Sequence, residues 1–99
     1  MGFEYKLKTI LTDKQTNEIQ DLLVDSITFD KKYKYDGKEF WDFKRPENNG
    51  KMPNINIVFE EDGIYICQYG SSYLWTDIEY LKDYIENEKI EYKIIDYQD

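Results

Sequence analysis

The chain has no histidine, one cysteine, two prolines and no long apolar run among its 99 residues. Without histidine it lacks the usual general base near neutral pH and the commonest metal ligand, and no Ser-His or Cys-His nucleophile can form within one chain. Because Cys67 is the only cysteine, no internal disulfide can form. The glycines are isolated, so there is no glycine-rich phosphate loop. These absences argue against an enzyme, a metal centre or a bound cofactor.

No apolar segment approaches the roughly 20 residues that a membrane-spanning helix needs. The first residues, Met1–Glu4, lack the basic and apolar regions of a secretory signal. We therefore expect a cytoplasmic protein. Its length fits one domain over residues 1–99, and its 40 % hydrophobic and 17 % aromatic residues are enough to form a core.

Charge is unevenly distributed along the sequence. Residues 1–59 carry ten acidic and ten basic side chains, whereas residues 60–99 carry eleven acidic and three basic ones, and so supply the whole formal net charge of −8. The second part also holds seven of the ten tyrosines. Nucleic acid and anionic lipid repel a net negative chain, so we expect neither as a partner. An acidic, tyrosine-rich surface suits a basic protein instead.

Local patterns predict six strands and two helices. Alternation of apolar and polar residues is typical of strands, and apolar residues at helical spacing are typical of helices. Thr12 with Gln15, and Thr76 with Glu79, form capping-box signatures at two helix starts. Asp36–Gly37 predicts a two-residue hairpin turn. The predicted strands are Phe3–Thr9, Phe29–Tyr35, Glu39–Lys44, Asn54–Phe59, Ile64–Tyr69 and Ile90–Ile94, and the predicted helices are Asp13–Ser26 and Thr76–Glu88.

This order, β-α-β-β-β-β-α-β, indicates an α+β fold. We expect a mainly antiparallel sheet of five to six strands with two helices packed on one face.

The second predicted helix carries the candidate site. When its apolar residues face the core, three carboxylates align on one outer flank, and a tyrosine falls near the outermost line. Like charges at this spacing mildly destabilise a helix, which favours a face that meets Arg or Lys on a partner, although an ordinary solvated face is the alternative. The candidate partner-binding residues are Glu79, Tyr80, Asp83 and Glu86.

A hairpin of opposite character spans residues 31–51, with seven basic and four acidic side chains. Its lysines between aromatic residues faintly resemble a nucleic-acid platform, but in an acidic chain they are better interpreted as guards of an exposed edge strand. Docking of this hairpin onto the acidic part of a second copy is a further alternative, which leaves a homodimer open.

In size, acidity, tyrosine content and lack of a catalytic inventory, the chain resembles small acidic toxin-immunity proteins of bacterial competition systems. The resemblance implies a non-catalytic inhibitor that neutralises a basic toxin or nuclease, with the carboxylate row and Tyr80 at the interface.

Three other functions fit the same sequence: an anti-defence inhibitor, a small-molecule-binding module or enzyme, and a structural or regulatory adaptor. A phage-encoded anti-defence inhibitor, acting as a nucleic-acid mimic, would use the same acidic face. Alternatively, a small-molecule-binding module would line a pocket between sheet and helices with aromatic side chains. The candidates for that lining are Phe40, Trp41, Tyr73 and Trp75.

Overall fold

The computed structural model describes residues 2–98, and these residues form six strands and two helices. The element order is β-α-β-β-β-β-α-β, as predicted, and the fold is α+β. The strands are β1 (Phe3–Lys8), β2 (Phe29–Tyr35), β3 (Lys38–Phe43), β4 (Ile55–Glu60), β5 (Gly63–Gln68) and β6 (Lys93–Asp96), and the helices are α1 (Asp13–Asp25) and α2 (Glu79–Asn87).

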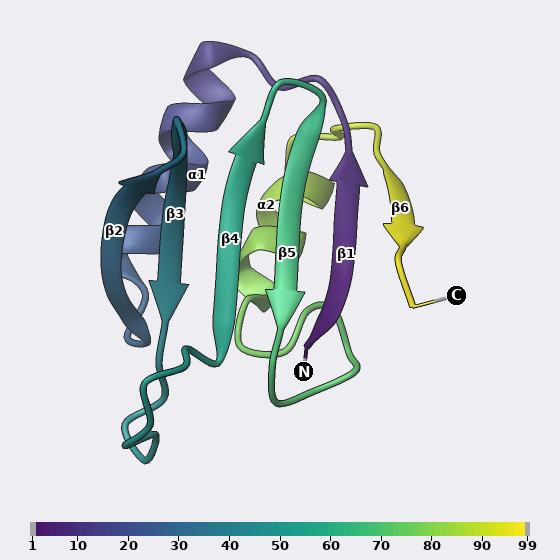
Figure 1. Cartoon of the computed structure of the whole chain (residues 1–99). Helices are drawn as coiled ribbons and strands as arrows, with labels where there is room; N and C mark the ends of the chain where they lie inside the picture. The colour runs from purple at the N-terminus through teal and green to yellow at the C-terminus, as the bar shows by residue number, and fades with distance from the viewer. Residues whose placement is uncertain (1, 99) are drawn as a thin grey trace.

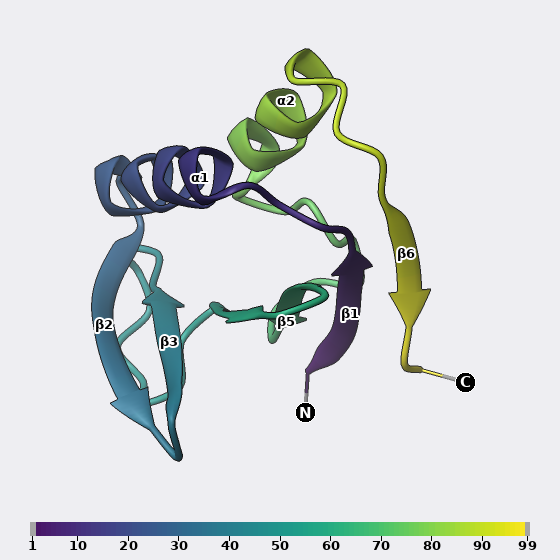
Figure 2. The ribbon, with the colours of Figure 1, turned by 90° about the horizontal axis from the view of Figure 1, so that it is seen from above.

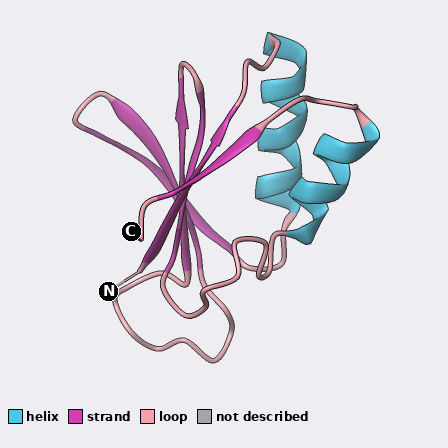
Figure 3. Ribbon diagram, turned by 90° about the vertical axis from the view of Figure 1, so that its right-hand side faces the viewer, coloured by secondary structure: helices cyan, strands magenta, loops and turns pink. Residues whose placement is uncertain are grey.

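All six strands belong to one antiparallel sheet with the order β2-β3-β4-β5-β1-β6 (Figure 1). Consecutive hairpins join β2 to β5, while β1 lies between β5 and β6. Both helices lie on the same face of the sheet, as Figures 2 and 3 show, so the predicted one-sided arrangement is confirmed. The other face carries no helix.

The core lies between the sheet and the two helices. Successive strand residues point to opposite faces, so alternate side chains of β1, β3, β4 and β5 point towards the helices. Full burial of one Leu, Ile or Phe side chain stabilises a fold by about 1.5–3 kcal/mol. The most deeply buried large side chains are Leu7, Ile19, Leu23, Trp41, Phe43, Ile55, Ile57, Ile64, Ile66, Ile78, Leu81 and Ile85.

Two of the predicted local signals form as expected. Thr12 caps α1: its hydroxyl accepts from the Gln15 amide at 3.1 Å, and the Gln15 side chain accepts from the Thr12 amide at 3.0 Å. Asp36 and Gly37 take positive φ angles of 53° and 76° between β2 and β3, the conformation that a two-residue hairpin turn requires. Both signals depend only on neighbours within a few residues.

The second capping box does not form, and α2 begins at Glu79 rather than near Thr76. The Thr76 hydroxyl lies 2.8 Å from the Ser71 hydroxyl, so it is engaged outside the helix. Asp77 then takes a φ of 63°, which interrupts any helix across it. Ile78 is the N-cap and provides no side-chain hydrogen bond.

The last strand also differs from its prediction, because it begins at Lys93 rather than Ile90. Ile90 and Tyr92 are half-buried against the core from a segment that is not part of a strand. The hydroxyl of Thr9 donates to the Glu91 carbonyl at 2.7 Å and so fixes this segment before β6 pairs with β1.

A substitution at Gly63, at the start of β5, would test the close approach of β1 and β5. A Cβ atom there would lie 2.0 Å from the carbonyl oxygen of Leu7 on β1, and its φ of 154° is unfavourable for other residues. Gly63→Ala is therefore expected to lower the free energy of unfolding by about 3 kcal/mol or more in urea denaturation.

Gly37→Ala is the matched control. Its φ is also positive, but nothing lies within 4 Å of the added Cβ, so a loss of about 1–2 kcal/mol is expected. Equal losses at the two positions would contradict the close approach of β1 and β5.

Candidate functional site

The two helices concentrate negative charge in one layer of the fold. Together α1 and α2 carry seven acidic and two basic side chains, which gives a formal net charge of −5 out of the chain's −8. The six strands carry six acidic and seven basic side chains. We call the outer surface of α1 and α2 the acidic helical layer; its carboxylates are Asp13, Glu18, Asp21, Asp25, Glu79, Asp83 and Glu86.

The acidic helical layer does not coincide with the acidic residues 60–99 of the sequence. Four of its seven carboxylates belong to α1, in the half whose charges cancel when they are counted along the chain. That count combined α1 with the lysines of β2, whereas the fold places β2 in the sheet. The acidic row of α1 was therefore visible in the sequence, but its pairing with α2 was not.

The predicted carboxylate row of α2 is fully accessible. Glu79, Asp83 and Glu86 are exposed, while Leu81 and Ile85 on the opposite side of the helix are each only 1 % exposed. The row therefore faces solvent, and no ion pair within residues 2–98 neutralises it.

Tyr80 lies elsewhere than expected. Instead of standing near the outermost line of α2, its ring packs against the core. Its hydroxyl is buried beside Ser26 at the end of α1 and finds no hydrogen-bond partner within residues 2–98, and burial raises its pKa. The difference arises because α1 packs alongside α2 and covers this side of the helix. Tyr80 therefore contributes to the packing of α2 and not to its exposed row.

Two apolar side chains that the sequence did not single out are exposed at the end of α1. Ile27, directly after the helix, is 93 % exposed, and Val24 is 43 % exposed. The turn around Ile27 is fixed, since Ser26 accepts from the Thr28 amide at 3.4 Å and Thr28 accepts from the Lys44 amide at 2.7 Å. Ile27 and Val24 thus form an apolar part of the surface at the end of α1, on either side of Asp25 in the sequence.

A hydrogen bond joins the two helices. The Tyr84 hydroxyl on α2 donates to Glu18 Oε1 on α1 at 2.6 Å. Burial and the Glu18 carboxylate both raise the pKa of Tyr84. This contact places carboxylates from two distant parts of the sequence in a fixed relation.

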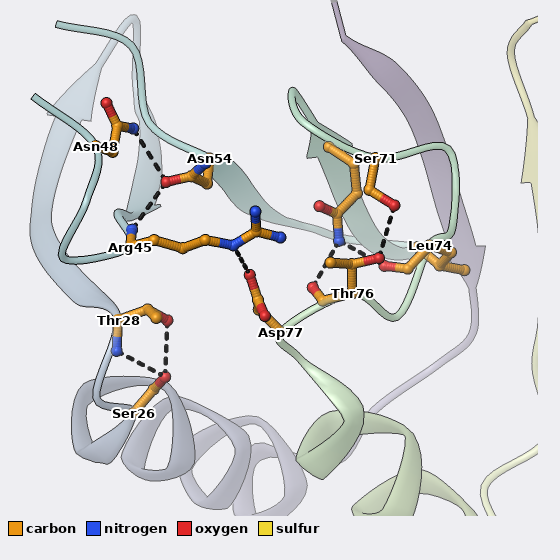
Figure 4. Close-up of polar contacts among 10 residues, drawn as sticks. Ser26, Thr28, Arg45, Asn48, Asn54, Ser71, Leu74, Thr76 and Asp77 are labelled. Carbon is orange, nitrogen blue, oxygen red and sulfur yellow. Dashed lines mark hydrogen bonds and ion pairs between the residues drawn. The ribbon is translucent and has the colours of Figure 1, made fainter. Parts of the chain in front are cut away.

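The start of α2 is held to the sheet by polar contacts (Figure 4). Arg45, just after β3, donates from Nε to Asp77 Oδ2 at 2.5 Å. The buried Gln68 amide donates to the carbonyls of Leu74 and Thr76 at 2.7 and 3.0 Å. Because these contacts hold the segment before α2, the carboxylate row is positioned before any partner arrives.

The basic hairpin lies at the edge of the sheet, where the sequence had placed it. β2 is an edge strand, and every residue from Asp30 to Tyr35 is exposed. The ammonium of Lys32 lies over the Trp41 ring, 4.9 Å from its centroid. This position agrees with the interpretation that lysines guard an exposed strand.

The aromatic residues considered for a small-molecule pocket do not gather around one. Trp41 and Trp75 are 2 % and 5 % exposed and form part of the core. Tyr73 is 52 % exposed, and Phe40 points away from the helices because its neighbour Trp41 points towards them. Cys67 is a buried free thiol whose pKa is raised by burial, as expected of a small apolar residue in a sheet.

Comparison with known proteins finds no matching family model, no similar curated protein and no similar solved structure. Within residues 2–98, no helix combines the length and the apolar character needed to cross a membrane. In the same part of the chain, no three His, Cys, Asp or Glu side chains gather in a way that could hold a metal ion.

The tyrosines predict how stability depends on pH. Burial raises the pKa of six of them, and Tyr65 also donates to Glu4 at 2.5 Å. These six are Tyr5, Tyr33, Tyr65, Tyr69, Tyr80 and Tyr84. Above about pH 10 the unfolded chain loses protons that the folded chain retains, so the free energy of unfolding must fall as pH rises further.

Urea denaturation at a series of pH values, with tyrosinate absorbance at 295 nm recorded in parallel, measures this effect. We expect stability to be insensitive to these groups below about pH 9 and to decrease above about pH 10, with much of the tyrosinate appearing as the chain unfolds. Tyr84→Phe should make the decrease shallower. If all ten tyrosines ionised near pH 10 in a chain that stayed folded, the assignment would be wrong.

Proposed function

We propose that this chain is a non-catalytic protein inhibitor of the immunity-protein kind, which neutralises a basic toxin by covering it with the acidic helical layer. The observation that carries the proposal is the layer itself: seven carboxylates from two helices on one face, with a formal net charge of −5. Because the negative charge is concentrated in one layer, that side of the molecule would attract a cationic protein most strongly.

Charge of this kind acts mainly on the rate and the orientation of binding. Complementary potentials steer two proteins together at rates far above those of uncharged pairs, and such steering weakens as salt screens it. An inhibitor that must capture a toxin before it acts gains directly from a fast encounter.

Affinity also needs contacts that exclude water. We assign this role to Ile27 and Val24, in place of the predicted Tyr80, because they are the large apolar side chains exposed at the end of α1. Glu79, Asp83 and Glu86 on α2 remain the proposed charged contacts, together with Asp21 and Asp25 on α1. Anchors of this type contribute most when a ring of polar residues shields them from solvent.

A charge-reversal experiment tests the proposal. The tagged chain and a Glu79→Lys, Asp83→Lys, Glu86→Lys variant are used as baits in a lysate of the source cells, and each retained protein is purified and expressed alone in a laboratory bacterium. We expect one strongly basic protein to be retained by the wild type at low salt, to be toxic alone and to be harmless with the chain. Its association rate with the variant should fall by about tenfold or more.

The matched control reverses three exposed carboxylates outside the layer, with the same change in net charge. Asp30→Lys, Glu47→Lys, Glu61→Lys should bind nearly as fast as the wild type, because these residues lie in β2 and in two loops. Equal losses in the two variants would mean that total charge, rather than the helical layer, drives binding. A retained protein that is not toxic would count against the immunity role.

The same capture separates the anti-defence alternative. A retained nuclease that restricts phage growth, and whose loss raises phage yield, would assign the acidic helical layer to a phage inhibitor that mimics nucleic acid.

A further inference from the structure

The helix-free face of the sheet carries a nearly buried carboxylate. Asp42 on β3 points to this face, because its neighbours Trp41 and Phe43 are buried on the helix side. Only 4 % of Asp42 is exposed. An ionised carboxylate in such a position costs free energy unless hydrogen bonds and a cation compensate it.

The two oxygens of this carboxylate differ in their surroundings. Asp42 Oδ1 accepts a hydrogen bond from the Asn56 side-chain amide at 2.6 Å and a long one from the Tyr33 hydroxyl at 3.5 Å. Oδ2 accepts none from residues 2–98 and is not fully buried. Within the same residues, Asp42 takes part in no ion pair. The site therefore has one carboxylate oxygen without a hydrogen-bond donor and lacks a cation.

Aromatic rings lie beside the carboxylate. Tyr33 stacks on Phe40, with ring centroids 5.4 Å apart and planes 8° from parallel. Tyr69 directly follows β5, and burial, the Cys67 thiol and the Asp42 carboxylate raise its pKa to about 12. Neither helix covers these rings, because both lie on the other face of the sheet (Figure 3).

The nearest cationic residue shows how a cation uses these rings. Lys31 on β2 is directly opposite Asp42 in the strand register. Its ammonium lies over the Tyr33 ring, 5.5 Å from the centroid, rather than in an ion pair with Asp42. The ring thus already attracts a positive charge, while the carboxylate stays free to bind another.

We propose that Asp42 is a recognition site for an arginine side chain of a partner protein, whose guanidinium takes the place of the Lys31 ammonium over the Tyr33 ring. Arginine fits better than lysine because its planar group can stack on the ring while one of its N–H groups donates to Oδ2, and because it is more easily desolvated. The site lies on the face opposite the acidic helical layer and does not depend on the proposed inhibitor function.

The test is an NMR titration of the ¹⁵N-labelled full chain with N-acetyl-arginine amide. We expect saturable shifts of the Asn56 side-chain amide and of the backbone amides of Lys31 and Asp42. N-acetyl-citrulline amide, a neutral analogue of the same shape, should give no saturable shifts, and N-acetyl-lysine amide should bind more weakly. Asp42→Asn should weaken arginine binding about tenfold or more, since hydrogen bonds to a charged group are lost.

Lys31→Thr provides an independent readout if Asp42→Asn does not fold. This substitution removes a neighbouring positive charge from an exposed position, so the arginine derivative should bind severalfold more tightly. The proposal is overturned if affinity is unchanged in Lys31→Thr, if arginine and citrulline derivatives give the same shifts, or if folded Asp42→Asn titrates like the wild type. Shifts confined to the acidic helical layer would likewise overturn it.

Discussion

The antiparallel pairing of β1 with β5 is the contact on which the rest of the fold depends. All six residues of β1 pair with β5, and the two backbones approach so closely at Gly63 that no other side chain fits there. Through this pairing the first strand lies inside the sheet, where it also receives β6. The chain must cross β5, β4 and β3 to pass from β1 to β2, and it must cross β1 to pass from β5 to β6. Each of these two connections contains a helix.

The position of β1 also explains the one-sided fold. α1 leads from β1 across the sheet to β2 at the far edge, and α2 leads from β5 back to β6 beside β1 (Figure 1). The two helices meet at the Tyr84–Glu18 hydrogen bond, and they bury the apolar side of β1, β3, β4 and β5. The face that they leave open is where Asp42 lies.

The sequence was informative where structure depends on neighbours along the chain. The cap at Thr12, the turn at Asp36–Gly37 and the apolar spacing of α1 all involve residues within one or two turns of each other, so element types and order were predictable. The start of α2 was not, because Thr76 is engaged by Ser71 and its carbonyl by Gln68. The half-buried position of Tyr80 was not predictable either, because it depends on the packing of α1 against α2.

The candidate surfaces were only partly predictable on the same grounds. Exposure of Glu79, Asp83 and Glu86 follows from helical periodicity once Leu81 and Ile85 are taken to face inward. The contribution of α1 to the same surface required knowing that two helices from opposite ends of the chain are neighbours. The isolated carboxylate of Asp42 required the strand register, which places Lys31 opposite it, and the side-chain contacts, which place the Lys31 ammonium over Tyr33 instead.

The seven carboxylates on two packed helices also affect the stability of the fold. The Tyr84–Glu18 hydrogen bond holds α1 and α2 together although both helices carry net negative charge. Repulsion between these charges lowers the stability of the folded chain. Dissolved salt weakens this repulsion by screening, and under the proposed function a cationic partner would weaken it further. Binding and folding are then linked: whatever neutralises the layer makes the chain harder to unfold.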